Sequence, residues 1–238
     1  MLRPRRTLPT PLLLGVAAGC LLPACAPDAV DVQGGAVGEL YTTFLLVAAG
    51  VFATVVGLLA WSVIRYRDRP GREEPRQHHG NVKLEAVWFV IPQALVVGLF
   101  LLSLSTLEEV DRAPAAADLG VRVQGFQWGW RFSYDGTGVE VTGTPERPPV
   151  LVLPVGRNVT FELISNDVIH SFYVPRFLVK RDTIPGKVNE LRVTVEEPGT
   201  YRGACAEFCG LLHARMDFTV RAVEPDRFET WLDEQEVS

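Results

Sequence analysis

Three long apolar runs lie in the first half of the chain, and only short ones follow in the second half. The first run, Leu12 to Leu22, comes after a basic start and ends among small residues. A basic, an apolar and a small-residue region in this order are typical of an export signal, and the run is too short to span a bilayer. We therefore predict a signal peptide over residues 1–24.

A cysteine follows this predicted signal directly. The segment Leu22-Pro23-Ala24-Cys25 resembles a bacterial lipobox, in which the cysteine becomes the lipidated first residue of the mature chain. We therefore predict lipidation at Cys25. Two alternatives stay open: cleavage before Cys20, which would cut the apolar run short, and a plain signal peptide that receives no lipid.

The second and third apolar runs, Leu40 to Ile64 and Ala86 to Leu107, contain no charged residue. Because an α-helix rises about 1.5 Å per residue, each run can cross a hydrocarbon core of about 30 Å. Pro92 lies inside the third run, and a spanning helix tolerates proline best where it packs against protein. We predict a two-helix transmembrane hairpin within residues 25–112, in preference to a pair of buried helices in a soluble protein.

The charges around the two spans predict their orientation. The connector, residues 65–79, carries five arginines among three acids. The outer flanks are acidic, with Asp28, Asp31 and Glu39 before the hairpin and Glu108, Glu109 and Asp111 after it. Because basic connectors stay on the cytoplasmic side, we predict that both termini lie outside the cytoplasm.

The pattern changes to short β-branched runs in residues 113–238, which we predict to form one external domain. Turn signals rich in Gly, Pro and Asp separate these runs, as expected for an all-β sandwich or Greek-key barrel. A helix is predicted only at the end, beginning at Pro225 with Phe228, Trp231 and Leu232 on one face. The β-type runs are Val121–Val123, Val139–Val141, Val150–Leu153, Val159–Leu163, Leu191–Val195 and Phe218–Val220.

Composition narrows the class of protein. The 238 residues are 47% hydrophobic, which is too apolar for a disordered chain. With 23 basic and 28 acidic residues the formal net charge is −5, which argues against nucleic acid as a partner. Four cysteines are too few for a disulfide framework in a chain of this length.

Candidate chemistry concentrates in the segment Cys205 to Met216, whose spacing is Cys-x3-Cys-x3-His-x2-Met, with His170 upstream. A blue-copper site needs two imidazoles, one thiolate and a distant thioether. This set offers one thiolate more than that. Two thiolates, two imidazoles and a thioether are enough for two coppers that share both sulfurs, each with its own terminal histidine.

Two other interpretations of the cysteine pair stay open beside copper. Cys205 and Cys209 would form a disulfide readily in an exported domain. The two cysteines and two histidines would also satisfy the tetrahedral preference of structural zinc. Neither interpretation explains Met216 at a short fixed offset, because zinc gains little from a thioether. We therefore favour copper.

Four segments together resemble subunit II of bacterial haem–copper cytochrome c oxidases, over about residues 36 to 232. They are Gln127-Trp128-Gly-Trp130, His170-Ser-Phe-Tyr-Val-Pro, Lys180-Arg-Asp-Thr-Ile-Pro-Gly186 and the loop from Cys205 to Met216. The resemblance implies a cupredoxin-like β-barrel that carries a binuclear copper centre called CuA. It also implies a multi-pass protein of the bacterial plasma membrane.

The resemblance assigns a ligand set to the copper centre. It implies that the side chains of His170, Cys205, Cys209, His213 and Met216 and the main-chain carbonyl of Glu207 bind copper. His170 and Met216 would serve one copper, and His213 and the Glu207 carbonyl the other. The Glu207 carboxylate would help to bind magnesium at the interface with the large subunit, unless it is an ordinary solvated acid.

The resemblance also implies roles outside the ligand set. Trp128 would receive electrons from cytochrome c, and Asp167 and Asp182 would lie on the docking surface. Residues 113–238 hold 18 acids and 13 bases, which favours a basic partner. Glu85 would lie at the cytoplasmic mouth of a proton pathway. The plainer interpretations are a strand aromatic, solvated surface acids and a carboxylate at a helix N-terminus.

The function implied is that of the electron-entry subunit of a proton-pumping terminal oxidase in a respiratory chain. The expected donor is cytochrome c, either free or as a membrane-bound cytochrome of a bc complex, and the expected partners are oxidase subunits I and III. The sequence has no haem signature and no cluster of histidines in the predicted spans, so oxygen reduction would belong to subunit I. Alternatives are a nitric or nitrous oxide reductase-like subunit, a quinol oxidase subunit, and a non-catalytic exported zinc or disulfide domain.

Overall fold

The computed structural model describes residues 29–68, 71, 77, 80–111 and 117–236. The predicted signal peptide and the predicted lipidation site Cys25 therefore lie outside the described residues. The chain divides into two compact units. Tyr41–Leu99 belongs to the first unit, and Pro27–Leu40 together with Phe100–Ser238 forms the second.

Two long apolar helices, α2 (Val32–Arg65) and α3 (Val82–Asp111), account for the two predicted spans. Each is long and apolar enough to cross a membrane, and its most apolar stretch has no buried residue. Side chains such as Leu58 and Phe89 are more than half exposed, as expected where lipid covers them. The chain is therefore membrane-anchored, as predicted.

Both helices extend beyond the predicted spans, because the flanking segments, which include polar residues, are also helical. At the start of α3, the Asn81 side chain accepts a hydrogen bond from the main chain of Leu84 at 3.2 Å. Glu85 accepts one from the main chain of Asn81 at 3.3 Å. These two bonds satisfy main-chain donors that a helix start leaves free, so Asn81 and Glu85 together cap α3.

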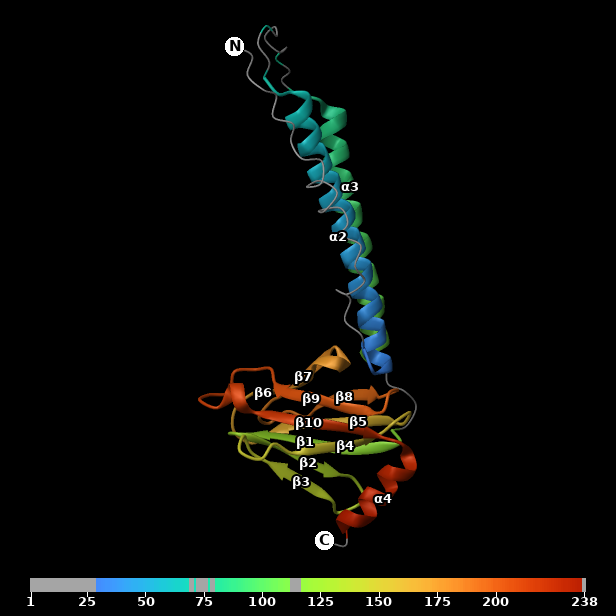
Figure 1. Cartoon of the computed structure of the whole chain (residues 1–238), viewed down its shortest axis with the longest axis vertical. Coiled ribbons are helices and arrows are strands. Elements are labelled where there is room, and N and C mark those ends of the chain that lie inside the picture. The colour runs from blue at the N-terminus through green and yellow to red at the C-terminus, as the bar shows by residue number, and fades with distance from the viewer. Residues whose placement is uncertain (1–28, 69–70, 72–76, 78–79, 112–116, 237–238) are drawn as a thin grey trace, which may run out of the picture. The chain divides into compact units, whose positions relative to one another are not determined.

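Two five-stranded sheets form the external domain, in the orders β3-β2-β1-β5-β8 and β4-β10-β9-β6-β7 (Figure 1). The pairs β1–β5 and β4–β10 are parallel, and the other pairs are antiparallel. This is the predicted β-sandwich or barrel class. The strands are β1 (Leu119–Phe126), β2 (Gly129–Tyr134), β3 (Glu140–Gly143), β4 (Val150–Pro154), β5 (Asn158–Ser165), β6 (His170–Val174), β7 (Val179–Thr183), β8 (Asn189–Thr194), β9 (Gly199–Cys205) and β10 (Asp217–Val223).

The core between the sheets follows from the alternation of side chains along the strands. In β5 every second residue is buried, from Val159 to Ser165. Aromatic rings fill the centre: Phe172 of β6 stacks on Phe218 of β10 with ring centroids 4.8 Å apart. Trp130 of β2 meets both rings edge-on and is fully buried.

Helix α4 (Pro225–Glu236) begins at the predicted proline and lies beside β4 (Figure 1). Phe228 and Leu232 are buried, as the helical pattern predicted. Four strands were not predicted from the sequence, namely β2, β6, β7 and β9. None of them contains the run of β-branched residues on which the prediction relied.

The residues just before and inside the start of α2 belong to the same unit as the β-domain. The main chain of Val30 donates to the Arg176 carbonyl at 3.1 Å and accepts from Glu196 at 2.9 Å. The Asp31 carboxylate caps α2 by accepting from the main chain of Gly34 at 3.1 Å. Asp31 is only 2% exposed, and burial is the main cause that raises its pKa to about 7.

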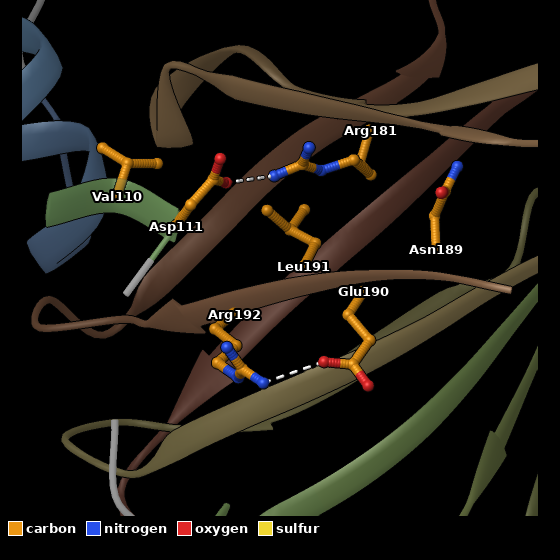
Figure 2. Close-up of a pocket in the computed structure, with 7 residues that line it drawn as sticks. All are labelled: Val110, Asp111, Arg181, Asn189, Glu190, Leu191 and Arg192. Carbon is orange, nitrogen blue, oxygen red and sulfur yellow. Dashed lines mark hydrogen bonds and ion pairs between the residues drawn. The ribbon is translucent and has the colours of Figure 1, made fainter. Parts of the chain in front are cut away.

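Within this same unit, the end of α3 meets β7. Asp111 pairs with Arg181 at 2.7 Å and Arg192 pairs with Glu190 at 2.8 Å around a pocket of about 290 Å³ (Figure 2). Because both guanidinium groups are already neutralised by carboxylates, this pocket offers an incoming anion no free positive charge.

Candidate metal centre

Two separate segments bring the predicted metal ligands together. His170 opens β6, while Cys205 ends β9 and Met216 immediately precedes β10. Strands β6 and β9 pair with each other, and the main chain of Ala206 donates to the Ser171 carbonyl at 3.0 Å. This pairing places the loop after β9 beside His170. The loop is closed by the Cys205 main chain, which donates to the Met216 carbonyl at 3.1 Å.

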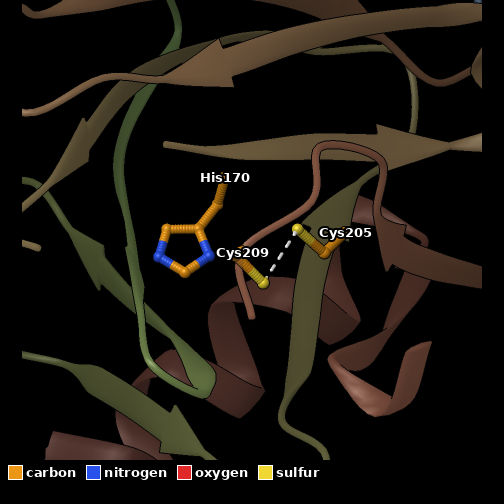
Figure 3. Close-up of side chains that lie close together, drawn as sticks. All are labelled: His170, Cys205 and Cys209. Atoms are coloured by element: carbon orange, nitrogen blue, oxygen red, sulfur yellow. Dashed lines mark hydrogen bonds between the residues drawn. The ribbon is translucent and has the colours of Figure 1, made fainter. Parts of the chain in front are cut away.

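Sulfur and nitrogen atoms cluster around Cys209. Its Sγ lies 3.8 Å from Cys205 Sγ, 3.7 Å from His213 Nδ1 and 3.7 Å from Met216 Sδ. The candidate ligand atoms of His170, Cys205 and Cys209 all lie within 4.8 Å of one another (Figure 3). Both cysteines are free thiols, because a disulfide requires a sulfur separation of about 2.05 Å.

The state of His170 tests whether these residues fit a metal. The side chain is fully buried, and its Nε2 lies 2.8 Å from an Asp167 carboxylate oxygen. Its Nδ1 is buried with no hydrogen-bond partner among the described residues. A buried nitrogen without a partner is costly, and metal-binding histidines characteristically hold a carboxylate on their other nitrogen. His170 therefore fits a metal ligand.

The remaining ligand candidates fit a soft metal. Met216 is 1% exposed, and Cys205 and Cys209 are 8% and 3% exposed. The carbonyl oxygen of Glu207 lies 3.2 Å from Cys205 Sγ, while the Glu207 side chain is exposed. A buried group of two thiols, a thioether and imidazole matches the preferences of copper better than those of hard cations.

Electrostatics in the metal-free site separate the two thiols. Burial raises the pKa of Cys205, but the neighbouring His170 and the main chain of Glu207 outweigh it, so that pKa falls below its usual value. Burial and the neighbouring Cys205 charge raise the pKa of Cys209. Burial lowers the pKa of His170, but Cys205 and Asp167 outweigh it and raise that pKa. Metal binding would take both sulfurs as thiolates, so it would release protons.

The turn between β1 and β2 supports the metal loop. Gln127 Nε2 and Trp128 Nε1 both donate to the Cys209 carbonyl, at 2.8 and 3.2 Å. Trp130 Nε1 donates to the Met216 carbonyl at 3.2 Å. The sequence alone gives Gln127 and Trp130 no role beyond their place in one motif with Trp128, and that place is the only signal that could have pointed to them.

The two predicted docking acids differ in their surroundings. Asp167 bonds His170 with one oxygen and accepts from the main chain of Gln127 at 2.6 Å with the other. Burial raises the pKa of Asp167, but the hydrogen bonds from His170, Val168 and Gln127 outweigh it and lower that pKa. Asp182 lies on β7, where its carbonyl accepts from Asn189 at 2.7 Å. Asp167 therefore belongs to the site's support, and Asp182 does not.

The other predicted site residue among the described residues, Glu85, belongs to the first unit, where its carboxylate caps α3.

Two family models match this chain, and both describe the same oxidase subunit. The family model described as cytochrome C oxidase subunit II, periplasmic domain, matches residues 146–223, which contain every predicted metal ligand. The model for the transmembrane domain of the same subunit matches residues 21–106.

Two of the relatives that cover nearly the whole chain illustrate the similarity. Cytochrome c oxidase subunit 2 of Alkalihalophilus pseudofirmus is 35% identical over 96% of this chain and 67% of its own length. Probable cytochrome c oxidase subunit 2 of Streptomyces avermitilis is 33% identical over 96% of this chain and 88% of its own. Among solved structures, the periplasmic domain of subunit II of cytochrome oxidase from Bradyrhizobium japonicum shares 32% identity, covering 51% of this chain and 96% of that one, with a TM-score of 0.47.

Proposed function

The chain belongs to the cytochrome c oxidase subunit II family, and from this premise we propose that it is the electron-entry subunit of a proton-pumping terminal oxidase. It receives electrons from reduced cytochrome c and delivers them to haem of oxidase subunit I, where oxygen is reduced to water. The observation that carries this proposal is the buried cluster of two thiols, a thioether and imidazole around Cys209.

The cluster suits a binuclear copper centre. When bound, copper supplies a reversible one-electron change of oxidation state. The ligands are the side chains of His170, Cys205, Cys209, His213 and Met216 and the carbonyl of Glu207. Two thiolates exceed the need of one copper, and the buried thioether 3.7 Å from Cys209 Sγ favours copper over zinc.

The protein's own residues fix the geometry of these ligands and shield several of them from water. Asp167 orients the His170 ring, and the main-chain bond from Cys205 to Met216 closes the loop. Burial of His170, Cys209 and Met216 excludes water from these three ligands, whereas His213 is half-buried. A pre-formed, rigid site changes little when an electron arrives or leaves, and this suits rapid electron transfer.

Electrons enter through Trp128. Its half-buried indole donates to the Cys209 carbonyl, so a direct bonded route joins a surface-accessible ring to a proposed ligand. The acidic balance of the domain favours a basic cytochrome c as the partner. Asp182 contributes to that charge, and so does Asp167, whose side chain is 30% exposed although it also bonds His170.

Several further assignments rest on the resemblance to the family. The exposed Glu207 carboxylate contributes to a magnesium site at the interface with subunit I, and Glu85 lies at the mouth of a proton pathway. Subunit III completes the assembly, with free or membrane-bound cytochrome c as donor. Both termini lie outside the cytoplasm, and Cys25 carries the lipid after residues 1–24 are removed.

Electron paramagnetic resonance of the copper-loaded full-length chain tests the proposal. We expect hyperfine coupling to two equivalent copper nuclei. The variant Cys209→Ser should lose this pattern, whereas Asp182→Asn, which changes a carboxylate that has no hydrogen bond to a proposed ligand among the described residues, should keep it. A single-copper pattern, or uptake of zinc with no uptake of copper, would overturn the proposal.

A further inference from the structure

Gln127 is bonded to both halves of the metal centre. Its main-chain N–H donates to Asp167 at 2.6 Å, and Asp167 in turn holds His170 at 2.8 Å. Its side-chain amide donates to the Cys209 carbonyl at 2.8 Å. One residue thus connects the carboxylate that supports the distant histidine with the loop that carries the other proposed ligands.

The Cys209 carbonyl receives two donors from consecutive residues, Gln127 and Trp128. The following residue, Gly210, has φ +117° and lies tightly against both of them. A Cβ added at Gly210 would lie 3.1 Å from the Trp128 ring and 3.2 Å from Gln127 Nε2. The turn between β1 and β2 therefore fits closely onto the loop at Cys209.

We propose that Gln127 is a positioning residue for the metal loop: through the chain His170–Asp167–Gln127–Cys209 it fixes the distance between the two segments that supply the ligands. This inference rests on the proposed copper centre. It adds a residue that makes no contact with the metal and that acts through Asp167 and Cys209.

Loss of the Gln127 amide would weaken this connection without removing a ligand. The Cys209 carbonyl would keep only the longer bond from Trp128. The net value of one such hydrogen bond corresponds to about a fivefold change in an equilibrium or a rate. The loop should then open more often, and both the thiolate and the metal should become more accessible.

The test compares Gln127→Leu with Gln124→Leu in the full-length chain. Gln124 lies three residues earlier on β1, and its side chain has no hydrogen bond to the described part of the chain, so the second variant is a matched control. We expect Gln127→Leu to release copper to a chelator about fivefold faster than the control does. We also expect faster hydrogen–deuterium exchange over residues 206–212 in the metal-free chain.

Gln127→Ala provides a second variant if Gln127→Leu does not fold, and Trp128→Phe removes only the other donor to the same carbonyl. It should also speed exchange in the loop, and the double variant should exceed either single one. Rates within twofold of the Gln124→Leu control, in both measurements, would overturn the inference. A wild-type chain that takes up no copper would overturn the proposed function, whereas normal copper uptake with unchanged release and exchange would overturn only the role of Gln127.

Discussion

Replacing Asp31 by asparagine should stabilise the protein at neutral and alkaline pH. Asp31 is 2% exposed, one of its oxygens accepts from Gly34, and the other has no hydrogen-bond partner among the described residues. Burial is the main cause that raises its pKa from 3.8 to about 7. The ionised carboxylate therefore destabilises the folded chain. This holds although Asp31 lies at the start of α2, where the helix dipole stabilises a negative charge.

The magnitude follows from the linkage between protonation and folding. Because the folded chain binds the Asp31 proton more tightly than the unfolded chain does, ionisation costs nothing below about pH 4. The cost grows between pH 4 and 7 and is complete above pH 7, where it reaches about 4 kcal/mol at most. A negative charge at the start of a helix is worth only about 0.3–1 kcal/mol, so the burial cost decides the sign.

Chemical unfolding of the full-length chain in detergent, followed by near-ultraviolet circular dichroism at pH 5 and pH 8, would measure the effect. In Asp31→Asn the amide oxygen would keep the acceptor for Gly34 and the charge would be gone, so the variant should gain stability at pH 8 and much less at pH 5. Asp233→Asn, which neutralises an exposed acid of α4, should change stability equally little at both values. A variant no more stable than wild type at pH 8 would refute the reasoning.

Three further predictions concern the metal centre and its electron donor. Asp167→Asn should lower copper affinity about 10- to 100-fold in a chelator competition, because His170 loses its carboxylate partner; unchanged affinity would contradict that role. Trp128→Ala should slow oxidation of cytochrome c by the assembled oxidase on the order of tenfold while the copper spectrum is retained, and an unchanged rate would remove Trp128 from the entry route. Raising the ionic strength from about 10 to 150 mM shortens the Debye length from about 30 to 8 Å, so stopped-flow association with a basic cytochrome c should slow; a salt-independent rate would contradict electrostatic steering.

The sequence predicted the helices and the metal loop, because each of them is marked by a pattern within one contiguous segment. Long uncharged runs predicted α2 and α3, and the spacing within Cys205–Met216 drew attention to a metal. Strand β2 was not predicted, because it contains no run of β-branched residues. Its aromatic residues alternate instead with Arg131 and Ser133. A period of two is present in this strand, but aromatic rings carry it in place of Val and Ile.

Contacts between residues far apart in the chain could not be predicted in the same way. Asp167 looked like a surface acid until the fold placed it against Gln127, 40 residues earlier. Gln127 and Cys209 are separated by 82 residues. In the sequence, Asp31 served only as one of the acidic residues that indicated the orientation of the hairpin. Nothing in the neighbouring sequence predicted that Asp31 is buried beside Val195. Such pairings depend on strand order, which local patterns in a single sequence do not reveal.

The two tryptophans of the Gln-Trp-Gly-Trp motif have different positions and roles, because only one of them lies within a strand. Trp130 lies in β2, where alternation turns it inward, and it reaches the Met216 carbonyl from the core. Trp128 lies in the turn, half-buried, and reaches the Cys209 carbonyl from the surface side. Gly129 between them has no room for a side chain, because a Cβ there would meet the Gly143 carbonyl and the ring of Phe126. The motif therefore holds the metal loop within its length, at Cys209, and at its end, at Met216, while only one of its indoles remains accessible to an electron donor.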